Sequence, residues 1–215
     1  MSPRGGSTVL VVDDQALVAC SIALALRGYG MAAAAVPPAR VAELAERRPA
    51  PAGGLVLLDL DRATEPVAVV TALCRAGWRV LLVTGTAAET AVALAVAAGA
   101  SGRVHKTRPL EELVRVATLV AGDRPVMTET ERARLRAVAE AAQLAARRDR
   151  DRWSRLTPRE REIVDRIAAG RRPAAIADEF VVSLATVRSH IRSILAKLGV
   201  GSQLEVAALA RARTT

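Results

Sequence analysis

Five short apolar runs alternate with five Ala- and Leu-rich segments over the first 120 residues, and this alternation limits the possible folds more than any other feature. The apolar runs span residues 8–12, 31–36, 54–59, 79–84 and 102–105. The segments with helical spacing span residues 16–27, 39–47, 67–76, 87–98 and 110–120. Nearly continuous apolar strands are typical of a parallel sheet with helices on both faces. The sequence therefore predicts a doubly wound α/β domain around a five-stranded parallel sheet.

Polar residues stand where the predicted strands end. They are two carboxylates after the first strand, one at the end of the third, a hydroxyl at the end of the fourth and an ammonium after the fifth: Asp13, Asp14, Asp59, Thr84 and Lys106. Ligands of such sheets bind beyond the carboxyl ends of the strands. Three converging carboxylates repel one another unless a divalent cation neutralises them, and Mg²⁺ suits an all-oxygen site. A carboxylate beside such a metal can attack a phosphoryl group and form an acyl phosphate.

Each of these residues also has a simpler structural explanation. Asp14 could cap the following helix, and Thr84 alone is an ordinary residue for the end of a strand. The complete set, in this order and at these strand ends, is difficult to explain by structure alone. It therefore favours a phosphoacceptor site, in which the ammonium and the hydroxyl would bind the phosphoryl oxygens.

Residues 8–121 resemble the receiver domain of bacterial two-component response regulators, which has a flavodoxin-like fold. The resemblance implies that Asp13 and Asp14 form the metal-binding pair and that Asp59 is the phosphoacceptor and a third metal ligand. It implies that Thr84 is the switch hydroxyl and that Lys106 contacts the phosphoryl group. It also implies a histidine kinase as phosphoryl donor and a switch that alters the face of the fourth helix, fifth strand and fifth helix.

Three features depart from the receiver pattern. The segment LDRATEP follows Asp59 in place of a Met-Pro and Gly-containing loop, and Lys106-Thr107 replaces the usual Lys-Pro pair. Arg103 stands at the usual position of the switch aromatic residue, and an arginine cannot swap inward without burying a charge. These departures leave an alternative open: an atypical, phosphorylation-independent regulator of the same architecture, controlled by a ligand or a protein partner.

Residues 122–153 lack a β pattern and are rich in strong helix formers, so they predict a helical linker. Thr128 and Glu131 have the spacing of a capping box. Leu135, Val138, Ala142 and Ala145 recur at a spacing that could line a thin helix–helix seam, although a solvated connecting helix with a charged end is the favoured explanation. The charged run at residues 147–152 predicts a hinge.

The last sixty residues are basic: residues 156–215 hold 10 basic and 6 acidic side chains and so contribute +4 to the net charge of +9. Capping signals predict four helices: one opened by Thr157, Pro158 and Glu160, one over residues 173–180, one from Ser183 to before Gly199, and one from Ser202 through Ala210. In the third helix an apolar stripe predicts the buried face, formed by Val187, Ile191, Ile194 and Leu198.

The opposite face of the third helix carries Arg188, Ser189 and Arg192. Small residues allow a close approach of the backbone, and two arginines one turn apart suit a helix in the major groove of DNA. The segment also resembles the LuxR-type helix-turn-helix of NarL/FixJ response regulators over residues 156–212. The resemblance implies that Arg188, Ser189 and Arg192 contact bases or phosphates, that Thr186 and Lys197 contact the backbone of DNA, and that the last helix pairs two copies.

The sequence thus predicts a receiver domain over residues 1–121, a helical linker over residues 122–153 and an all-α four-helix helix-turn-helix domain over residues 154–215. The expected function is a transcription factor controlled by phosphorylation of Asp59. The expected partners are double-stranded DNA, a sensor histidine kinase and a second copy of the chain, with RNA polymerase as a further candidate and Mg²⁺ as cofactor. A phosphohydrolase using the same carboxylates is the weaker alternative, because it leaves the DNA-binding half unexplained, so no enzyme activity is expected.

Neither a signal peptide nor a membrane span is predicted, because no apolar stretch approaches the roughly 18 residues that a span requires. The expected location is therefore the cytoplasm. The two cysteines, Cys20 and Cys74, lie far apart in apolar surroundings and are expected to be reduced thiols of the core.

Overall fold

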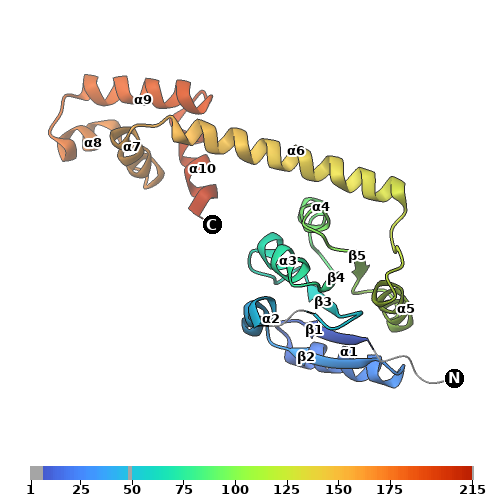
Figure 1. The fold of residues 1–215 in the computed structure, drawn as a ribbon. Coiled ribbons are helices and arrows are strands. Elements are labelled where there is room, and N and C mark those ends of the chain that lie inside the picture. The colour runs from blue at the N-terminus through green and yellow to red at the C-terminus, as the bar shows by residue number, and fades with distance from the viewer. Residues whose placement is uncertain (1–6, 48–49, 215) are drawn as a thin grey trace. The chain divides into compact units, whose positions relative to one another are not determined.

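The computed structural model describes residues 7–47 and 50–214, and the chain divides into two compact units, residues 1–142 and 143–215. Figure 1 shows the helices and strands of both units. Each unit is described by itself below.

The N-terminal unit contains the predicted five-stranded parallel sheet. Its strands are β1 (Thr8–Val12), β2 (Ala32–Val36), β3 (Leu55–Asp59), β4 (Arg79–Thr84) and β5 (Gly102–His105). They lie in the order β2-β1-β3-β4-β5, and every neighbouring pair is parallel. The direction in which the chain winds reverses between β1 and β3, and ligand sites of such sheets form at this switch point.

Helices cover both faces of the sheet (Figure 1), as the doubly wound prediction requires. They are α1 (Ala16–Gly28), the 3₁₀ turn η1 (Pro38–Arg40), α2 (Val41–Arg47), α3 (Pro66–Arg75), α4 (Glu89–Ala97) and α5 (Leu110–Ala121). Side chains of β1 alternate between two apolar cores. Val9 and Val11 pack with α1 and α5, whereas Leu10 and Val12 pack with α2, α3 and α4. This alternation explains why the strands are apolar throughout.

Two local expectations for the N-terminal unit are wrong. The segment predicted as one helix over residues 39–47 begins as the 3₁₀ turn at Pro38 and becomes α-helical only at Val41. Cys20 is exposed on α1 rather than buried, and Cys74 is half-buried; both are free thiols. The Ala-rich surroundings of Cys20 gave no indication of which face of α1 would be buried, because alanine occurs on both faces.

The predicted linker helix is α6 (Glu129–Ser154). Thr128 caps it by accepting a hydrogen bond from the Glu131 backbone N–H at 3.1 Å. Two residues of the predicted seam lie against the core that contains α3 and α4: Leu135 is buried in it and Val138 packs against it, next to the buried Ala139. The hinge predicted at residues 147–152 is wrong, because this run is helical and Asp149 pairs with Arg152 at 2.9 Å, one turn along.

The C-terminal unit contains the four predicted helices, α7 (Pro158–Ala168), α8 (Pro173–Phe180), α9 (Leu184–Leu198) and α10 (Gln203–Thr214). The predicted α9 stripe is buried in one apolar core with Ile163, Ile167 and Ile176. α10 continues beyond Ala210, where the sequence predicted its end. In the described part of the chain, no single helix has the length and apolar character needed to cross a membrane. Only α9 and α10 taken together, bent by 62°, reach that length and composition.

The position of Leu135 predicts that the start of α6 stabilises the N-terminal unit. Leu135→Ala should lower the free energy of unfolding of this unit by about 3 kcal/mol, because it opens a cavity in the core. Denaturant unfolding followed by the fluorescence of Trp78, which is buried in the same core, measures this in a Trp153→Phe background. Leu144→Ala is the matched control, since Leu144 is 48% exposed on the same helix and should cost less than about 1 kcal/mol. Equal losses would contradict this packing.

Candidate functional site

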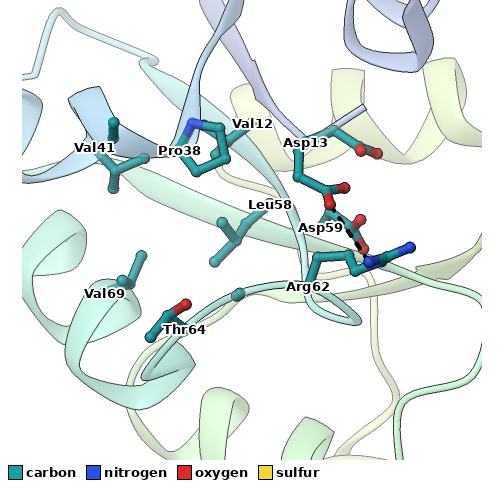
Figure 2. A pocket seen from close by; sticks show the side chains of 12 residues that line it. Val12, Asp13, Pro38, Val41, Leu58, Asp59, Arg62, Thr64 and Val69 are labelled. Atoms are coloured by element: carbon teal, nitrogen blue, oxygen red, sulfur yellow. Dashed lines mark ion pairs between the residues drawn. The ribbon is translucent and has the colours of Figure 1, made fainter. Parts of the chain in front are cut away.

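Three carboxylates meet at the carboxyl ends of β1 and β3. Asp13, Asp14 and Asp59 each place an oxygen within 4.8 Å of the others, and Figure 2 shows the region around them. Asp13 and Asp59 are buried and Asp14 is exposed. Asp14 does not cap α1, whose N-cap residue is Gln15 and has no side-chain cap hydrogen bond. The simpler explanation for Asp14 as a cap is therefore removed, and the carboxylate remains available for another role.

The donor set fits a hard divalent cation. All three ligand atoms are carboxylate oxygens, which Mg²⁺ prefers. Asp59 Oδ2 is buried and, within the described residues, receives no hydrogen bond of good geometry. A buried carboxylate oxygen of this kind needs a cation, because its charge is costly without one.

Lys106 supplies the cation within the chain. Its Nζ lies 2.8 Å from Asp59 Oδ2, 3.7 Å from Asp13 Oδ2 and 3.6 Å from Asp61 Oδ2. Burial alone would lower the pKa of Lys106, but Asp59, Asp13 and Asp61 together raise it above its ordinary value. The pKa of Asp13 is also raised, mainly because the carboxyl is buried. The lysine is therefore held as a cation against the acidic cluster.

Thr84, at the end of β4, lies at the same edge of the sheet and is buried. Its hydroxyl does not bond Asp59 but donates to Asp61 Oδ1 at 2.7 Å. Asp61 Oδ2 accepts a second hydrogen bond from the Gly85 N–H at 2.6 Å, and Oδ1 accepts two more from Thr86 and Ala87, at 3.1 and 2.7 Å. Burial would raise the pKa of Asp61, but these hydrogen bonds hold it well below its usual range.

Asp61 was not singled out from the sequence. Its backbone N–H donates to Asp59 Oδ1 at 3.0 Å, so it lies directly beside the predicted phosphoacceptor. Two sequence features could have identified it. A second aspartate follows Asp59 in Leu-Asp-Leu-Asp, residues 58–61, and the small residues Gly85 and Thr86 follow the next strand along the chain.

Two further features border the acidic cluster. A pocket of about 290 Å³ lies beside it, with apolar walls formed by Val12, Pro38, Val41, Leu58 and Val69 (Figure 2). Arg62 lines the same pocket, and its guanidinium lies 3.7 Å from Asp14. Arg103 is exposed on β5 between the buried Gly102 and Val104, so no charge is buried at the position where the receiver pattern has an aromatic ring.

In the C-terminal unit α9 presents the predicted polar face. Ser183 caps the helix by accepting from the Thr186 N–H at 3.1 Å. Thr186, Arg188, Ser189 and Arg192 are all exposed. Within the described residues, neither Arg188 nor Arg192 forms an ion pair or a side-chain hydrogen bond. Two guanidinium groups on one face are thus available to an external partner.

Lys197, on the same helix, is held differently. Its Nζ lies 2.8 and 2.6 Å from the two oxygens of Glu160, a buried carboxylate of α7. Glu160 also accepts from the Ser193 hydroxyl at 2.7 Å and from the Thr157 N–H at 2.8 Å. Although burial opposes ionisation, these contacts lower the pKa of Glu160 to about 2. The structure therefore directs the Lys197 ammonium toward Glu160, in a contact that joins α7 to α9.

Comparison with known proteins finds similarity to bacterial regulatory proteins. A family model described as bacterial regulatory proteins of the LuxR family matches residues 154–210. The nitrate/nitrite response regulator NarL of Escherichia coli K12 is 31% identical over 119 residues, which are 55% of this chain and 54% of NarL. The transcriptional activator DevR/DosR of Mycobacterium tuberculosis is 30% identical over 132 residues, 61% of this chain and 59% of that protein. Residues 154–210 thus match the LuxR family model, and the chain is similar to the response regulators NarL and DevR/DosR over 55–61% of its length.

The matches to curated relatives span little more than half of their length. Among solved structures, the response regulator ChrA of a heme-sensing two-component system is 25% identical, with 98% of this chain and 99% of that chain covered and a TM-score of 0.46. Helices α7, α8 and α9 and most of α10 lie in the residues that the LuxR family model matches.

The low pKa of Glu160 predicts a pH dependence of stability in the helix-turn-helix domain. A carboxyl with a folded pKa of about 2, against an ordinary value of 4.5, stabilises the fold fully above pH 4.5. This contribution is lost as the pH falls through 2. The free energy of unfolding of the wild type should decrease between pH 5 and 2. In Glu160→Gln this decrease should be about 2–3 kcal/mol smaller.

Unfolding followed by Trp153 fluorescence in a Trp78→Phe background measures this decrease, since Trp153 packs against the core of the C-terminal domain. Glutamine can still form the capping box, so the change isolates the charge. Glu162→Gln is the matched control, because Glu162 is 52% exposed and pairs only with Arg159 at the surface. If both variants kept the wild-type pH dependence, ionisation of Glu160 would not be the cause of the pH-dependent stability.

Proposed function

We propose that this chain is a DNA-binding transcription regulator whose receiver domain is controlled by phosphorylation of Asp59. The proposed organisation is a receiver over residues 1–121, a linker over residues 122–153 and a DNA-binding domain over residues 154–215. The observation that carries the proposal is the exposed face of α9, where Arg188 and Arg192 have no partner within the described residues, in a domain that matches the LuxR family.

DNA recognition would use α9 as the helix in the major groove. Arg188 and Arg192 lie one turn apart, and an arginine can bond guanine edges or phosphates. Ser189 between them and Thr186 near the start of the helix are exposed, and both offer hydroxyl groups to the backbone of DNA. Lys197 would act chiefly through Glu160, since its ammonium is directed there. Two copies paired through α10 would read half-sites about one helical turn apart.

Control through the receiver would use the acidic cluster. An oxygen of Asp59 would attack the phosphorus of a phosphohistidine in a sensor kinase, the P–N bond would break, and its electron pair would remain on the imidazole. Mg²⁺ held by Asp13, Asp14 and Asp59 would supply charge neutralisation when bound. Lys106, 2.8 Å from Asp59, is placed to contact the transferred phosphoryl group.

A second candidate is a receiver of the same architecture that is controlled by a ligand or a protein rather than by phosphorylation. The pocket beside the acidic cluster favours it, because its walls are mostly apolar and would suit a small organic molecule. The exposed Arg103 also favours it, since the aromatic switch residue is absent. The next experiment separates the two candidates.

Beryllofluoride with Mg²⁺ mimics a phosphoryl group on Asp59. Sedimentation velocity should show the chain shifting from monomer to dimer when it is added, and Asp59→Asn should not respond. Glu65→Gln is the matched control, because it removes one exposed carboxylate from the same loop and should respond like the wild type. A chain that is already dimeric, or whose sedimentation is unchanged, would favour the second candidate.

DNA binding is tested with a duplex selected from a random-sequence pool by the full-length protein. Arg188→Ala and Arg192→Ala should each raise the Kd for this duplex at least about fivefold, which is about 1 kcal/mol. Arg171→Ala is the charge-matched control; Arg171 is exposed between α7 and α8, and its loss should change the Kd less than about twofold. Unchanged affinity in both α9 variants would overturn the assignment of this face to DNA.

A further inference from the structure

The strongest unassigned feature is the carboxylate of Asp61. Its two oxygens accept four hydrogen bonds, from the Thr84 hydroxyl and from the backbone N–H groups of Gly85, Thr86 and Ala87. The donor–acceptor distances lie between 2.6 and 3.1 Å, and the side chain is only 13% exposed. Successive backbone N–H groups that converge in this way form an anion-binding nest. In this structure the anion in the nest is a side chain of the protein itself.

The same donors are those that the proposed phosphorylation needs. A phosphoryl group on Asp59 would be stabilised by Lys106, by the Thr84 hydroxyl and by backbone N–H groups at the end of β4. Lys106 Nζ lies 2.8 Å from Asp59 Oδ2 and 3.6 Å from Asp61 Oδ2, so the two carboxylates share one ammonium. The backbone N–H of Asp61 bonds Asp59 Oδ1, which fixes the two residues side by side. A phosphoryl group and the Asp61 carboxylate would therefore compete for the same nest.

We infer that Asp61 is an internal substitute for the phosphoryl group: its carboxylate holds the loop Thr84–Ala87 in the arrangement of an anion-bound receiver, and a phosphoryl group on Asp59 must displace it. This inference rests on the proposed phosphorylation of Asp59. It has two consequences. The loop before α4 is ordered without phosphorylation, and the site binds a phosphoryl group less tightly than it would without Asp61.

A purely structural role for Asp61 predicts the opposite effect on anion binding. If the carboxylate only braced the loop, its removal would disorganise Thr84 and the three N–H groups, and the affinity for a phosphoryl mimic would fall. If the carboxylate is a competing ligand, its removal frees four donors and the affinity rises. The sign of the change therefore distinguishes a competing ligand from a brace.

The experiment uses full-length protein and two substitutions, Asp61→Ala, which empties the nest, and Asp61→Asn, which keeps the volume and removes the charge. Amide hydrogen exchange at Gly85, Thr86 and Ala87, followed by NMR without any phosphoryl mimic, should be at least about tenfold faster in Asp61→Ala than in the wild type. Beryllofluoride with Mg²⁺ should restore the protection. The beryllofluoride concentration at half-saturation should be at least about fivefold lower in both variants than in the wild type.

Glu65→Gln is again the matched control and should behave as the wild type in both measurements. Equal or weaker beryllofluoride binding in the Asp61 variants, or unchanged exchange of the three amides, would overturn the inference while phosphorylation of Asp59 still stood. Absence of beryllofluoride binding in every protein, including Asp61→Ala, would overturn the proposed phosphorylation. The inference would then fail with it, because no phosphoryl group would compete with Asp61 for the nest.

Discussion

Three carboxylates at one edge of the N-terminal sheet, Asp13, Asp59 and Asp61, share the single ammonium group of Lys106, and the local structure there follows from how this charge is balanced. Asp13 and Asp59 are buried next to each other because β1 and β3 are neighbours in a parallel sheet. Lys106 compensates for part of this charge, and the geometry of the three oxygens leaves room for a divalent cation to compensate for more. Asp61 lies farther from the same ammonium, at 3.6 Å, and its charge is balanced mainly by hydrogen bonds from backbone N–H groups. The hydrogen bonds to Asp61 stabilise the conformation of the loop after β4, because residues 85–87 all direct their backbone N–H groups to its carboxylate.

The helix-turn-helix domain is organised by the same kind of constraint. Glu160 is buried at the start of α7, and it is ionised because Lys197, Ser193 and Thr157 all donate to it. Breaking such a buried pair is costly, since the remaining charge would lack a partner. The pair fixes α7 against α9 and thereby orients the exposed face of α9. It also separates the cations of this helix into one that stabilises the fold and two, Arg188 and Arg192, that face outward.

Patterns within single elements were the features most readily predicted from sequence. The strands and the buried stripe of α9 follow from apolar spacing, because the positions that one element buries depend mainly on its own periodicity. What could not be predicted depends on contacts between distant segments. The bonds of Asp61 require the loop after β4 to lie beside it, and those of Lys197 require Glu160, 37 positions earlier. The predicted hinge at residues 147–152 is wrong because the prediction rested on the charge of this run alone. Arginine favours helices, and Asp149 pairs with Arg152 one turn along the helix.

The position of Asp61 also bears on how the proposed receiver, which has no aromatic switch residue, would transmit its state. Arg103 is exposed on β5, so rotation of a ring at that position is not available. The loop bound by Asp61 instead leads directly into α4, whose Glu89 pairs with Arg134 of α6. Leu135 and Ala139 of α6 lie in the same core as Val92 and Ala93 of α4. The loop, α4 and the first part of α6 therefore form one contiguous series of contacts inside the N-terminal unit. If Asp61 is displaced as inferred above, the backbone N–H groups of residues 85–87 are where the change in these contacts would begin.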